Sequence, residues 1–586
     1  MCGIIGYRGP GHAGEIVLQA LRSMEYRGYD SVGVASVSSG KIDLRKDKGR
    51  IDEVAERLGF SSLKGAVALG HTRWATNGMA SRENAHPHLD CSGSLAIVHN
   101  GIVENFQELK ASLDRHKFAS DTDTEVIAHL IEDSLHLGFP QAVQAAFRRL
   151  EGRNAIVAIN KDSDVLVGAR QGSPLIVGVG KGEYFIASDI PAFLKHTKNV
   201  MYLDDREMVI IGEKPFFMSL ATGRPIQKRL VTIGWDASQA EKGDYPHFLL
   251  KEIMDQKDTI LRAINQDDVE ILKIAEKINS AFGTFFTGCG TAGNVCLVGE
   301  YLFSKIAKKH VNFVVSSEFP NYEHFLTDKT LLIAISQSGE TADVLDAIEA
   351  ARKKKAKILS LVNVQGSSLA RLSDHSFLIN AGPEKAVAST KATTSQLALL
   401  TLLAYACAGK LQEGKRLLIE VAGKVNDMLN PRYEQHIKRL AEKIHNSKNI
   451  FIIGKGINYP IALESAIKIM EVSQIHAQGF AGGELKHGPL ALISEGVPCI
   501  VFIPNDEIKG HILNNAIEVK TRGGYIIGIS PENNSIFDYW IRVPDVVDTS
   551  PIVNIIPVQI LAYHLGVLRG CDPDYSRNLA KSVVVR

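Results

Sequence analysis

The second half of the sequence contains a pattern that occurs twice, and this repeat limits the fold more than any other feature. One pair of similar segments is TFFTGCGTAGNVCLVGEYLFSK and NIFIIGKGINYPIALESAIKIM, in which Gly288-x-Gly290 matches Gly454-x-Gly456. In both copies, apolar runs of strand length alternate with amphipathic helical patterns, which is typical of parallel α/β sheets. We therefore expect two copies of one α/β domain.

Residues 1–225 have a different pattern, with short β-type runs such as CGIIGY, SVGVASV, LAIVHNGI and MVIIG and few long helical stretches. Such runs predict layered sheets with some helices, so the expected fold class is α+β followed by α/β. We expect a sheet domain at 1–225, a connector at 226–262, α/β domains at 263–415 and 437–570, and a tail at 571–586.

The composition is that of a globular protein with large cores, because 45% of the 586 residues are hydrophobic, 22% are charged and the net charge is +1. This charge argues against a general nucleic-acid binder, and no uninterrupted apolar stretch has membrane-spanning length. The seven cysteines include no C-x-x-C pair, which argues against disulfides or a structural zinc site. We expect a cytoplasmic protein without metal and without a signal peptide.

The loop SQSGET follows an apolar strand of the first copy and precedes a helical pattern. It supplies polar donors where backbone N–H groups already favour an anion, namely Ser336, Gln337, Ser338 and Thr341. These residues suit the phosphate of a small sugar, although a helix cap with solvated neighbours explains the same residues equally well. The second copy has IPNDEIKG here, so one copy alone has the features of a phosphate site.

The first copy also matches a dinucleotide-binding pattern. GCGTAG has the form G-x-G-x-x-G, and Glu318 ends the next apolar strand, where a dinucleotide fold places its ribose-binding acid. The second copy lacks the third glycine, and the loop SQSGET favours a phosphate monoester. A nicotinamide-binding enzyme is therefore the weaker alternative.

Three charged residues share one face of a helical pattern in the second copy. Glu464, Lys468 and Glu471 are spaced by four and three residues. A surface ladder of ion pairs is the common explanation, but the surrounding segment IALESAIKIMEV is largely apolar. A partly buried Glu–Lys group is suited to proton transfer, since burial and pairing change both pKa values.

Several long motifs of this half resemble the sugar isomerase (SIS) domain, including SQSGETADVL, VASTKA, GGELKHGPLALI and RNLAKSV. The tandem pair resembles the isomerase half of the glutamine–fructose-6-phosphate aminotransferase family. This resemblance implies that Glu471 moves a proton between C1 and C2 of the sugar, assisted by Lys468 and Glu464. It also implies that His487 opens the sugar ring of a neighbouring subunit, which requires a homodimer, and that Lys581 forms a Schiff base with the ketose.

The same resemblance assigns the sugar-phosphate contacts. They are Thr291, Ser336, Gln337, Ser338, Thr341, Val387 and Ser389. The family commonly has serine where this chain has Ala292, and the loss of one neutral hydrogen bond there would weaken binding by about 0.5–1.5 kcal/mol.

At the other end of the chain, Cys2 follows Met1 in MCGIIGY. An isolated cysteine in such an apolar run is usually a buried strand residue. If Met1 is removed, however, the free α-amino group of Cys2 has an ordinary pKa of about 7.7–8.0 and can act as the general base for its own thiol. The segments EYRGYDSVG, GHTRWATNG, NAHPH, VHNGIVEN and SDTDTEVIAHLI then follow in order.

Together these motifs resemble the N-terminal nucleophile (Ntn) class II glutamine amidotransferase domain, whose fold is an αββα sandwich. The resemblance implies that Cys2 attacks the carboxamide of glutamine, while Asn100 and Gly101 form the oxyanion hole. It further implies that Arg73 binds the glutamine carboxylate and that Asp123 binds its amino group.

The resemblance implies roles for two more residues. Trp74 matches the residue that gates the passage of ammonia, and Arg27 matches a residue in a loop that changes conformation. The whole chain then converts glutamine and fructose 6-phosphate into glucosamine 6-phosphate and glutamate, the first step of hexosamine (UDP-GlcNAc) biosynthesis, without a cofactor. An amidophosphoribosyl-type transferase would need a diphosphate-binding loop with adjacent acids, and we find none. A sugar-phosphate sensor with a degenerate site would not need Glu471, His487 and Lys581 together.

Overall fold

The structure is a computed structural model that describes residues 2–234, 239 and 241–584. The chain forms two compact units, one made of residues 1–241 with 580–586 and the other of residues 242–579. Met1, and with it the expectation that this residue is removed, lies outside the described residues.

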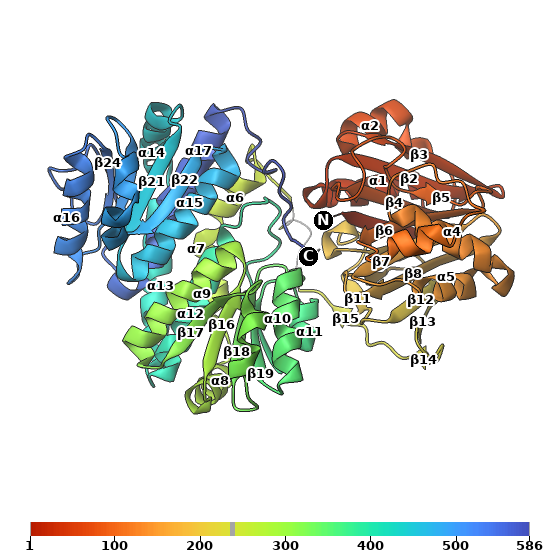
Figure 1. Ribbon diagram of the computed structural model, residues 1–586, viewed down its shortest axis with the longest axis horizontal. Coiled ribbons are helices and arrows are strands. Elements are labelled where there is room, and N and C mark those ends of the chain that lie inside the picture. Colours follow the sequence, from red (N-terminus) through yellow and green to blue (C-terminus); the bar gives the residue numbers. More distant parts are fainter. Residues whose placement is uncertain (1, 235–238, 240, 585–586) are drawn as a thin grey trace. The chain divides into compact units, whose positions relative to one another are not determined.

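Two antiparallel sheets form the centre of the first unit (Figure 1). The eight-stranded sheet has the order β15 (Val231–Thr232), β11 (Asn199–Tyr202), β9 (Ile176–Val179), β10 (Tyr184–Ala187), β1 (Gly3–Arg8), β4 (Val67–Arg73), β2 (Ser31–Ser38) and β3 (Lys41–Lys48). The seven-stranded sheet has the order β14 (Pro225–Ile226), β13 (Pro215–Ser219), β12 (Glu207–Ile211), β8 (Ser163–Gln171), β7 (Asn154–Asn160), β6 (Leu95–Gly101) and β5 (His88–Leu89).

The alternation of side chains along β1 explains the layers of this unit. Ile4 belongs to the core between the two sheets, whereas Ile5 belongs to a core shared with α1. Helices therefore cover the outer face of each sheet, which gives the expected αββα sandwich. The helices are α1 (Ala13–Ser23) and α2 (Ile51–Leu58) on the eight-stranded sheet, and α3 (Phe106–Ala111), α4 (Thr124–Ser134) and α5 (Phe139–Phe147) on the seven-stranded sheet.

The second unit contains two parallel sheets of five strands with the same strand order. The first sheet has the order β17 (Val311–Val315), β16 (Thr284–Gly288), β18 (Leu331–Ser336), β19 (Lys357–Val362) and β20 (His375–Leu378). The second has the order β22 (His476–Ala481), β21 (Asn449–Gly454), β23 (Pro498–Phe502), β24 (Tyr525–Ser530) and β25 (Tyr539–Arg542). The predicted duplication is therefore confirmed by the topology.

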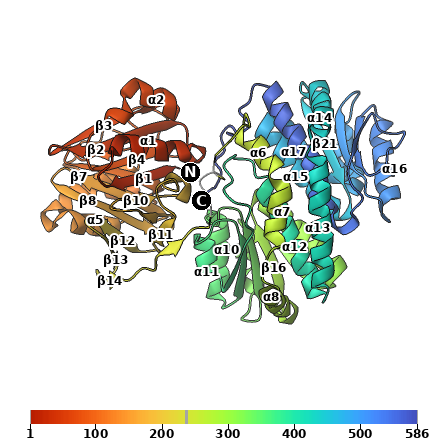
Figure 2. The ribbon, with the colours of Figure 1, turned by 180° about the vertical axis from the view of Figure 1, so that it is seen from behind.

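Helices cover both faces of each parallel sheet. One large core joins the two sheets and includes residues of α6 (Phe248–Met254), α7 (Gln256–Ile264), α8 (Asp268–Ser280), α9 (Gly290–Leu302), α12 (Lys391–Cys407), α13 (Leu411–Met428), α14 (Pro431–Ile444), α15 (Tyr459–Ser473) and α17 (Ser550–Leu568). Figure 2 shows α7, α12 and α13 side by side from behind. The outer faces carry α10 (Ala342–Lys353), α11 (Ser368–Leu372) and α16 (Lys509–Lys520).

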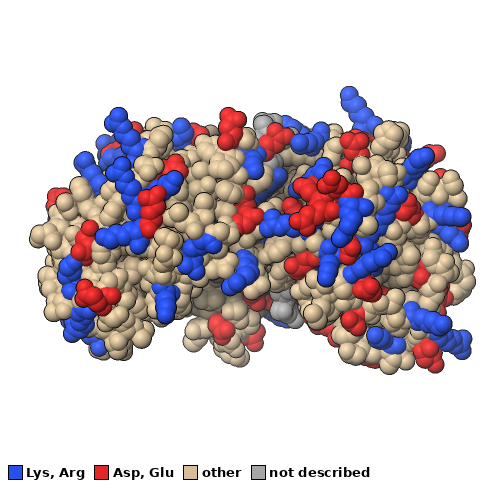
Figure 3. Space-filling model, turned by 90° about the horizontal axis from the view of Figure 1, so that it is seen from above, with Lys and Arg blue, Asp and Glu red and all other residues tan. Residues whose placement is uncertain are grey.

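Among the described residues, Val547–Leu568 is a helical stretch with the length and composition of a membrane span. The protein itself buries 89% of its apolar window, as expected for a core helix. On the face shown in Figure 3, cationic and anionic side chains are interspersed. This distribution agrees with the net charge of +1.

Candidate functional site

Cys2 immediately precedes β1, and main-chain atoms of Trp74 lie on either side of its thiol. The Trp74 N–H donates to Cys2 Sγ at 3.3 Å, and the thiol donates to the Trp74 carbonyl at 3.6 Å. The start of β1 is held closely, because the Gly3 N–H donates to Thr72 Oγ1 at 3.1 Å and a Cβ at Gly3 would lie 2.7 Å from that oxygen. The thiol is only partly buried, so a substrate can reach it.

Asn100 lies at the end of β6 and faces Cys2 from the other sheet. Its Nδ2 donates to the Cys2 carbonyl at 3.0 Å. Its Oδ1 accepts from Nε2 of the buried His71 at 3.1 Å, and the same nitrogen also donates to the His99 carbonyl at 3.0 Å. Because both partners of that nitrogen are oxygens, His71 carries its hydrogen on Nε2 and thereby fixes the orientation of the Asn100 amide. Burial lowers the pKa of His71 to about 3, which keeps the ring neutral.

Gly101 follows Asn100 and has a backbone conformation that favours glycine. Its φ is +135°, and a Cβ there would lie 1.9 Å from the carbonyl oxygen of Arg153. A side chain is excluded for both reasons. The amide side chain of Asn100 and the backbone amide of Gly101 are the two donors that the sequence assigned to the oxyanion hole.

Arg73 and Asp123 are both buried beside this thiol. The Arg73 guanidinium donates to carbonyls of the loop that follows it, with Nη2 2.9 Å from the Gly78 oxygen and also bonded to the Asn77 oxygen. Burial lowers the pKa of Arg73, although the neighbouring Cys2, Asp30 and Asp123 act in the opposite direction. Asp123 directly precedes α4, and its Oδ2 accepts from the Val103 N–H at 2.8 Å.

Arg27 is buried and also contacts Cys2. Its Nε donates to the Cys2 carbonyl at 3.2 Å, and its Nη1 forms an ion pair with Asp189 Oδ2 at 2.9 Å. The Tyr26 hydroxyl donates to the same Asp189 oxygen at 2.6 Å. The carbonyl of Cys2 is therefore held by two side chains, Arg27 and Asn100.

In the second unit, equivalent helices of the two α/β copies meet at one buried carboxylate. Glu464 of α15 is 1% exposed, and it accepts hydrogen bonds from Thr291 Oγ1 and Asn294 Nδ2 of α9, each at 3.0 Å. Burial raises the pKa of Glu464. Thr291 was expected to bind the sugar phosphate. In the structure its hydroxyl is hydrogen-bonded to Glu464.

Lys468 joins the two carboxylates of α15. Its Nζ lies 3.5 Å from Glu464 Oε1 and 2.6 Å from Glu471 Oε2. Burial alone would lower the pKa of Lys468, but the charges of Glu471 and Glu464 outweigh it and raise this pKa. The three residues form one connected ion-pair group, with Glu471 as its more exposed end.

The loop SQSGET lies at the carboxyl end of β18 and leads into α10. The Ser336 hydroxyl is buried, accepts from the Gly339 N–H at 3.0 Å and lies 3.4 Å from Thr341 Oγ1. Gly339 has φ of +66°, and a Cβ there would lie 2.1 Å from Ser367 Oγ. Gln337, Ser338 and Thr341 are partly exposed around the start of α10. A packed glycine turn therefore presents these polar side chains at a helix N-terminus.

Val387 and Ser389 lie in the segment before α12. Val387 is buried, and the Ser389 hydroxyl donates to Glu384 Oε2 at 3.1 Å. The other carboxylate oxygen of Glu384 accepts from the N–H groups of Thr390 and Ala392, each at 3.0 Å. Glu384 therefore caps α12 and holds the predicted sugar-binding segment in place.

The two remaining predicted catalytic residues are His487 and Lys581. His487 is exposed in the short helix Gly482–His487, and within the described chain no hydrogen bond or ion pair joins it to Glu464 or Glu471. Lys581 is partly buried and belongs to residues 580–586, which group with the first unit.

Sequence reasoning missed four residues that hold the predicted ones. They are His71 beside Asn100, Asp189 beside Arg27, Asn294 beside Glu464 and Glu384 beside Ser389. For Asn294 a signal existed, because it lies three residues after Thr291 and so shares its helix face. Glu384 lies five residues before Ser389 in the same segment. The contacts of His71 and Asp189 join residues that are distant in the chain, and nothing in the local sequence indicates them.

The fold and the two sites define a class of enzyme that joins a glutamine amidotransferase domain to a tandem sugar isomerase module. The glutamine amidotransferase family model matches residues 71–195, and the SIS domain model matches residues 277–406 and 443–569. A solved structure from Francisella tularensis, the C-terminal domain of glucosamine-fructose-6-phosphate aminotransferase, covers 57% of this chain and 99% of its own. It is 32% identical, with a TM-score of 0.52.

Full-length relatives identify the family. The chain is 45% identical to the glutamine–fructose-6-phosphate aminotransferase (isomerizing) of Pyrococcus horikoshii and 44% identical to that of Thermococcus kodakarensis. The corresponding protein of Thermus thermophilus is 39% identical, and each comparison covers 100% of both chains. The chain belongs to the glutamine–fructose-6-phosphate aminotransferase (isomerizing) family.

Proposed function

We propose that this enzyme converts glutamine and fructose 6-phosphate into glutamate and glucosamine 6-phosphate. The single observation that carries the proposal is that two complete sets of reactive groups occur in one chain. One set surrounds the Cys2 thiol, and the other is the Glu464–Lys468–Glu471 group, to which Thr291 and Asn294 of α9 are hydrogen-bonded. The alternatives of a nicotinamide enzyme or a sensor leave one of these sets without a role.

At the first site, Cys2 Sγ attacks the carboxamide carbon of glutamine while the α-amino group accepts the thiol proton. Asn100 Nδ2 and the Gly101 N–H stabilise the oxyanion. Nδ2 carries two hydrogens, so one can remain on the Cys2 carbonyl while the other donates to the substrate oxygen. The C–N bond breaks, the amino group returns the proton and ammonia leaves. Water then hydrolyses the glutamyl thioester, which releases glutamate and restores the thiol.

At the second site, the Lys581 amine condenses with C2 of the open-chain ketose and releases water. Ammonia replaces Lys581 and leaves an imine at C2. Glu471 then takes a proton from C1 and delivers it to C2, so C1 becomes an aldehyde while C2 becomes an amine. The two carbons exchange oxidation levels, and the reaction needs no external oxidant or reductant.

Lys468 supports this proton transfer by neutralising Glu471, which it contacts at 2.6 Å. Glu464 holds Lys468 from the other side, and Asn294 and Thr291 hold Glu464. Arg73 and Asp123 bind the carboxylate and amino group of glutamine, and Trp74 gates the ammonia that passes to the sugar.

The further assignments form part of the same proposal. The sugar phosphate binds the SQSGET loop together with Val387 and Ser389, and His487 opens the sugar ring of a partner subunit in a cytoplasmic homodimer. The functional domains are 1–225, 263–415 and 437–570, with a connector at 226–262. The tail 571–586 then brings Lys581 to the sugar.

The experiment is an assay of hexosamine phosphate formed from glutamine and fructose 6-phosphate. We expect Cys2→Ala to abolish glutamine-dependent synthesis while the isomerisation of the sugar phosphate continues. Cys571→Ala is the matched control, because the one hydrogen bond recorded for this partly buried thiol among the described residues is to the Ser473 carbonyl, at 3.9 Å. Unchanged glutamine use in Cys2→Ala would contradict the proposal.

A further inference from the structure

Four side chains of the first unit converge at a point that the proposed reaction does not use. They come from three segments: Cys91 from the turn between β5 and β6, His116 from the segment between α3 and α4, and His129 and Glu132 from α4. One nitrogen, sulfur or oxygen atom from each lies within 4.8 Å of all the others. We propose that these four residues bind one divalent metal ion of the zinc class.

The distances fit a tetrahedral site. Cys91 Sγ lies 3.6 Å from His116 Nδ1 and 3.7 Å from His129 Nδ1. A tetrahedral zinc ion with bonds of about 2.3 Å to sulfur and about 2.0–2.1 Å to nitrogen places these two ligand atoms about 3.6 Å apart. Glu132 Oε2 is 3.0 Å from both nitrogens, so a small outward movement of this carboxylate completes the tetrahedron.

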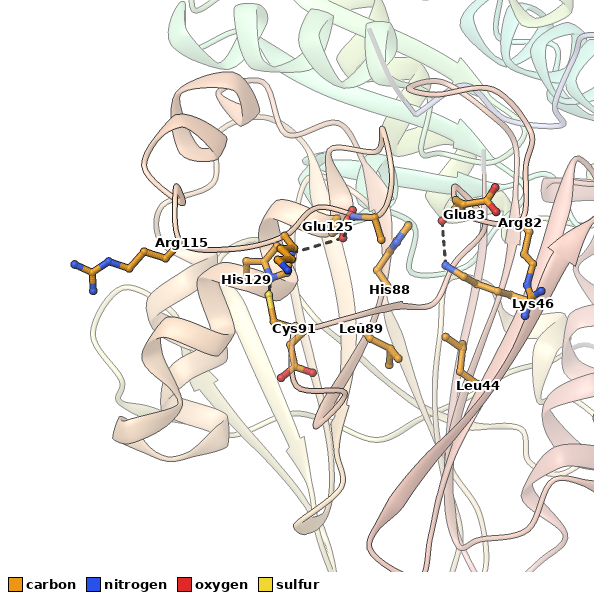
Figure 4. A pocket seen from close by; sticks show the side chains of 13 residues that line it. Leu44, Lys46, Arg82, Glu83, His88, Leu89, Cys91, Arg115, Glu125 and His129 are labelled. Atoms are coloured by element: carbon orange, nitrogen blue, oxygen red, sulfur yellow. Dashed lines mark hydrogen bonds and ion pairs between the residues drawn. The ribbon is translucent and has the colours of Figure 1, made fainter.

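The remaining ring nitrogens face carboxylates, as they do in many metal sites. His116 Nε2 is 2.9 Å from Asp133 Oδ1, and His129 Nε2 is 3.6 Å from Glu125 Oε1. A histidine that binds a metal through one nitrogen normally donates the other N–H to a carboxylate, which fixes its tautomer. Figure 4 shows His129 between Cys91 and Glu125, in this arrangement.

Hydrogen bonds alone account for the same contacts only if both rings are doubly protonated, which places two cations with ring centroids 4.7 Å apart. Both Nδ1 atoms lie 3.0 Å from Glu132 Oε2, so each ring would need a hydrogen on Nδ1. His116 would need a second hydrogen for Asp133, and the single thiol hydrogen of Cys91 faces two rings. A metal ion removes this conflict, since lone pairs of all four atoms then point to one centre. The thiolate and the Glu132 carboxylate balance a charge of +2.

The turn that carries Cys91 is held in place before any ion binds. Asp90 accepts hydrogen bonds from Ser92 Oγ at 2.5 Å, Ser94 Oγ at 2.8 Å and the Leu95 N–H at 2.8 Å. The Cys91 N–H also donates to Glu132 Oε2 at 3.1 Å. Preorganisation of this kind lowers the cost of ordering the ligands when the ion binds.

Solvent reaches the cluster on one side. Cys91 is exposed, and Cys91 and His129 line a pocket of about 610 Å³ whose other lining residues include His88 and Lys46 (Figure 4). An ion can therefore enter without unfolding of the domain. With four protein ligands the site is closed in the manner of structural zinc sites, and the ion joins two loops to α4.

The test starts from the full-length protein, freed of metal with a chelator and titrated with Zn²⁺. We expect one equivalent of tight binding per chain, a higher Tm with zinc, and a thiolate-to-metal charge-transfer band with Co²⁺. Cys91→Ser and His129→Gln should weaken Zn²⁺ binding by more than about 100-fold, because each removes a direct ligand. Cys2→Ala should still bind one equivalent of Zn²⁺. This result would show that Cys2, the other cysteine of this unit, is not a ligand of the ion. The exposed His136→Gln is the matched histidine control.

A variant at the edge of the site distinguishes a loss of metal binding from a folding defect. Asp133 is exposed and contacts His116, so Asp133→Asn should fold normally and weaken Zn²⁺ binding by about 10- to 100-fold. Asp114→Asn, in an exposed position of the preceding loop, should leave Zn²⁺ binding unchanged. The proposal is overturned if the wild-type chain binds no Zn²⁺ equivalent, or if Cys91→Ser and Asp133→Asn bind it as tightly as the wild type. Because these readouts are metal binding and Tm, they are independent of whether the proposed reaction occurs.

Discussion

The two SIS copies have the same strand order but different chemistry at the matching loops. In the first copy, β18 leads through Ser336 and Thr341 into α10. In the second copy, β23 leads through buried Ile503 and Pro504 into α16, and Asp506 Oδ1 accepts from the Ile508 N–H at 3.0 Å. The second helix start is therefore occupied by the protein's own carboxylate, which repels a phosphate that the first would attract.

The helices that follow the first strand of each repeat differ in a complementary way. α9 contributes the uncharged donors Thr291 and Asn294, whereas α15 contributes Glu464, Lys468 and Glu471. These helices pack against each other, so the duplicated fold forms one site from two different faces. The comparison shows that duplication kept the scaffold while the side chains at the matching positions diverged.

The largest effect is expected when Glu471, the proposed proton carrier on α15, is replaced. Glu471→Gln should lower kcat of hexosamine phosphate synthesis by about 10²- to 10⁴-fold, the usual contribution of general acid–base catalysis. The exposed Glu442→Gln on α14 of the same copy is the control. Glutaminase activity measured in parallel should remain, and a kcat within threefold of the wild type would show that α15 is not the catalytic helix.

Alanine substitutions at the glycines that follow the first strand of each copy test whether the backbone constraint there is the same in both copies. Gly290 and Gly456 have φ of +52° and +57°, so alanine at either position should cost about 1–2 kcal/mol of unfolding free energy. Ile508 Cδ1 lies 3.3 Å from the position of a new Cβ at Gly456, whereas nothing lies within 4 Å at Gly290. In urea denaturation, the loss of unfolding free energy in Gly456→Ala should therefore be equal to that in Gly290→Ala or slightly larger. If only one of the two variants lost stability, the two copies would not be equivalent at this glycine.

A third test concerns the buried charge that distinguishes α15 from α9. Burial raises the pKa of Glu464 above its unfolded value, so the folded state binds this proton more tightly. Its contribution to stability is full below the unfolded pKa and declines as the pH rises to the folded pKa, by about 1.4 kcal/mol for each unit of separation. In denaturant unfolding from about pH 4 upward, Glu464→Gln should flatten this decline. An unchanged slope would show that Glu464 is not responsible.

The smallest expected effect compares the two helix starts. Thr341→Val keeps the shape but removes a hydroxyl, so KM for fructose 6-phosphate should rise by about 2- to 10-fold, equivalent to about 0.5–1.5 kcal/mol. Asp506→Asn at the matching place in the second copy should leave KM unchanged. Steady-state kinetics at constant glutamine measures both, and the comparison fails if Asp506→Asn changes KM as much as Thr341→Val.

Local patterns predicted the duplication and the layered sheets, because strand periodicity is a local signal. The αββα arrangement came from the resemblance to the Ntn family that the contiguous motifs carry. The sequence did not predict the partners of the site residues. The contact between Glu464 and Asn294 joins helices of different repeats, and the bond from His71 to Asn100 joins different sheets. Such contacts depend on how the elements pack, which no window of sequence contains.

The sequence did not indicate the ligand set proposed for zinc, for a related reason. Spaced pairs of cysteines are the usual local signal of a zinc site, whereas this set has one cysteine with two histidines and a glutamate from three segments. Only His129 and Glu132 gave a local signal, because their spacing of three places them on one helix face. Cys91 and His116 join them through the packing of two loops on α4.

The polar contacts of the Cys2 thiol have a consequence for evolution. Both come from main-chain atoms of Trp74 rather than from its indole ring. A codon change at position 74 can therefore alter the ring without deleting either contact. Selection on the side chain of Trp74 therefore acts through its proposed role as the ammonia gate, whereas the polar surroundings of the sulfur are inherited with the course of the backbone.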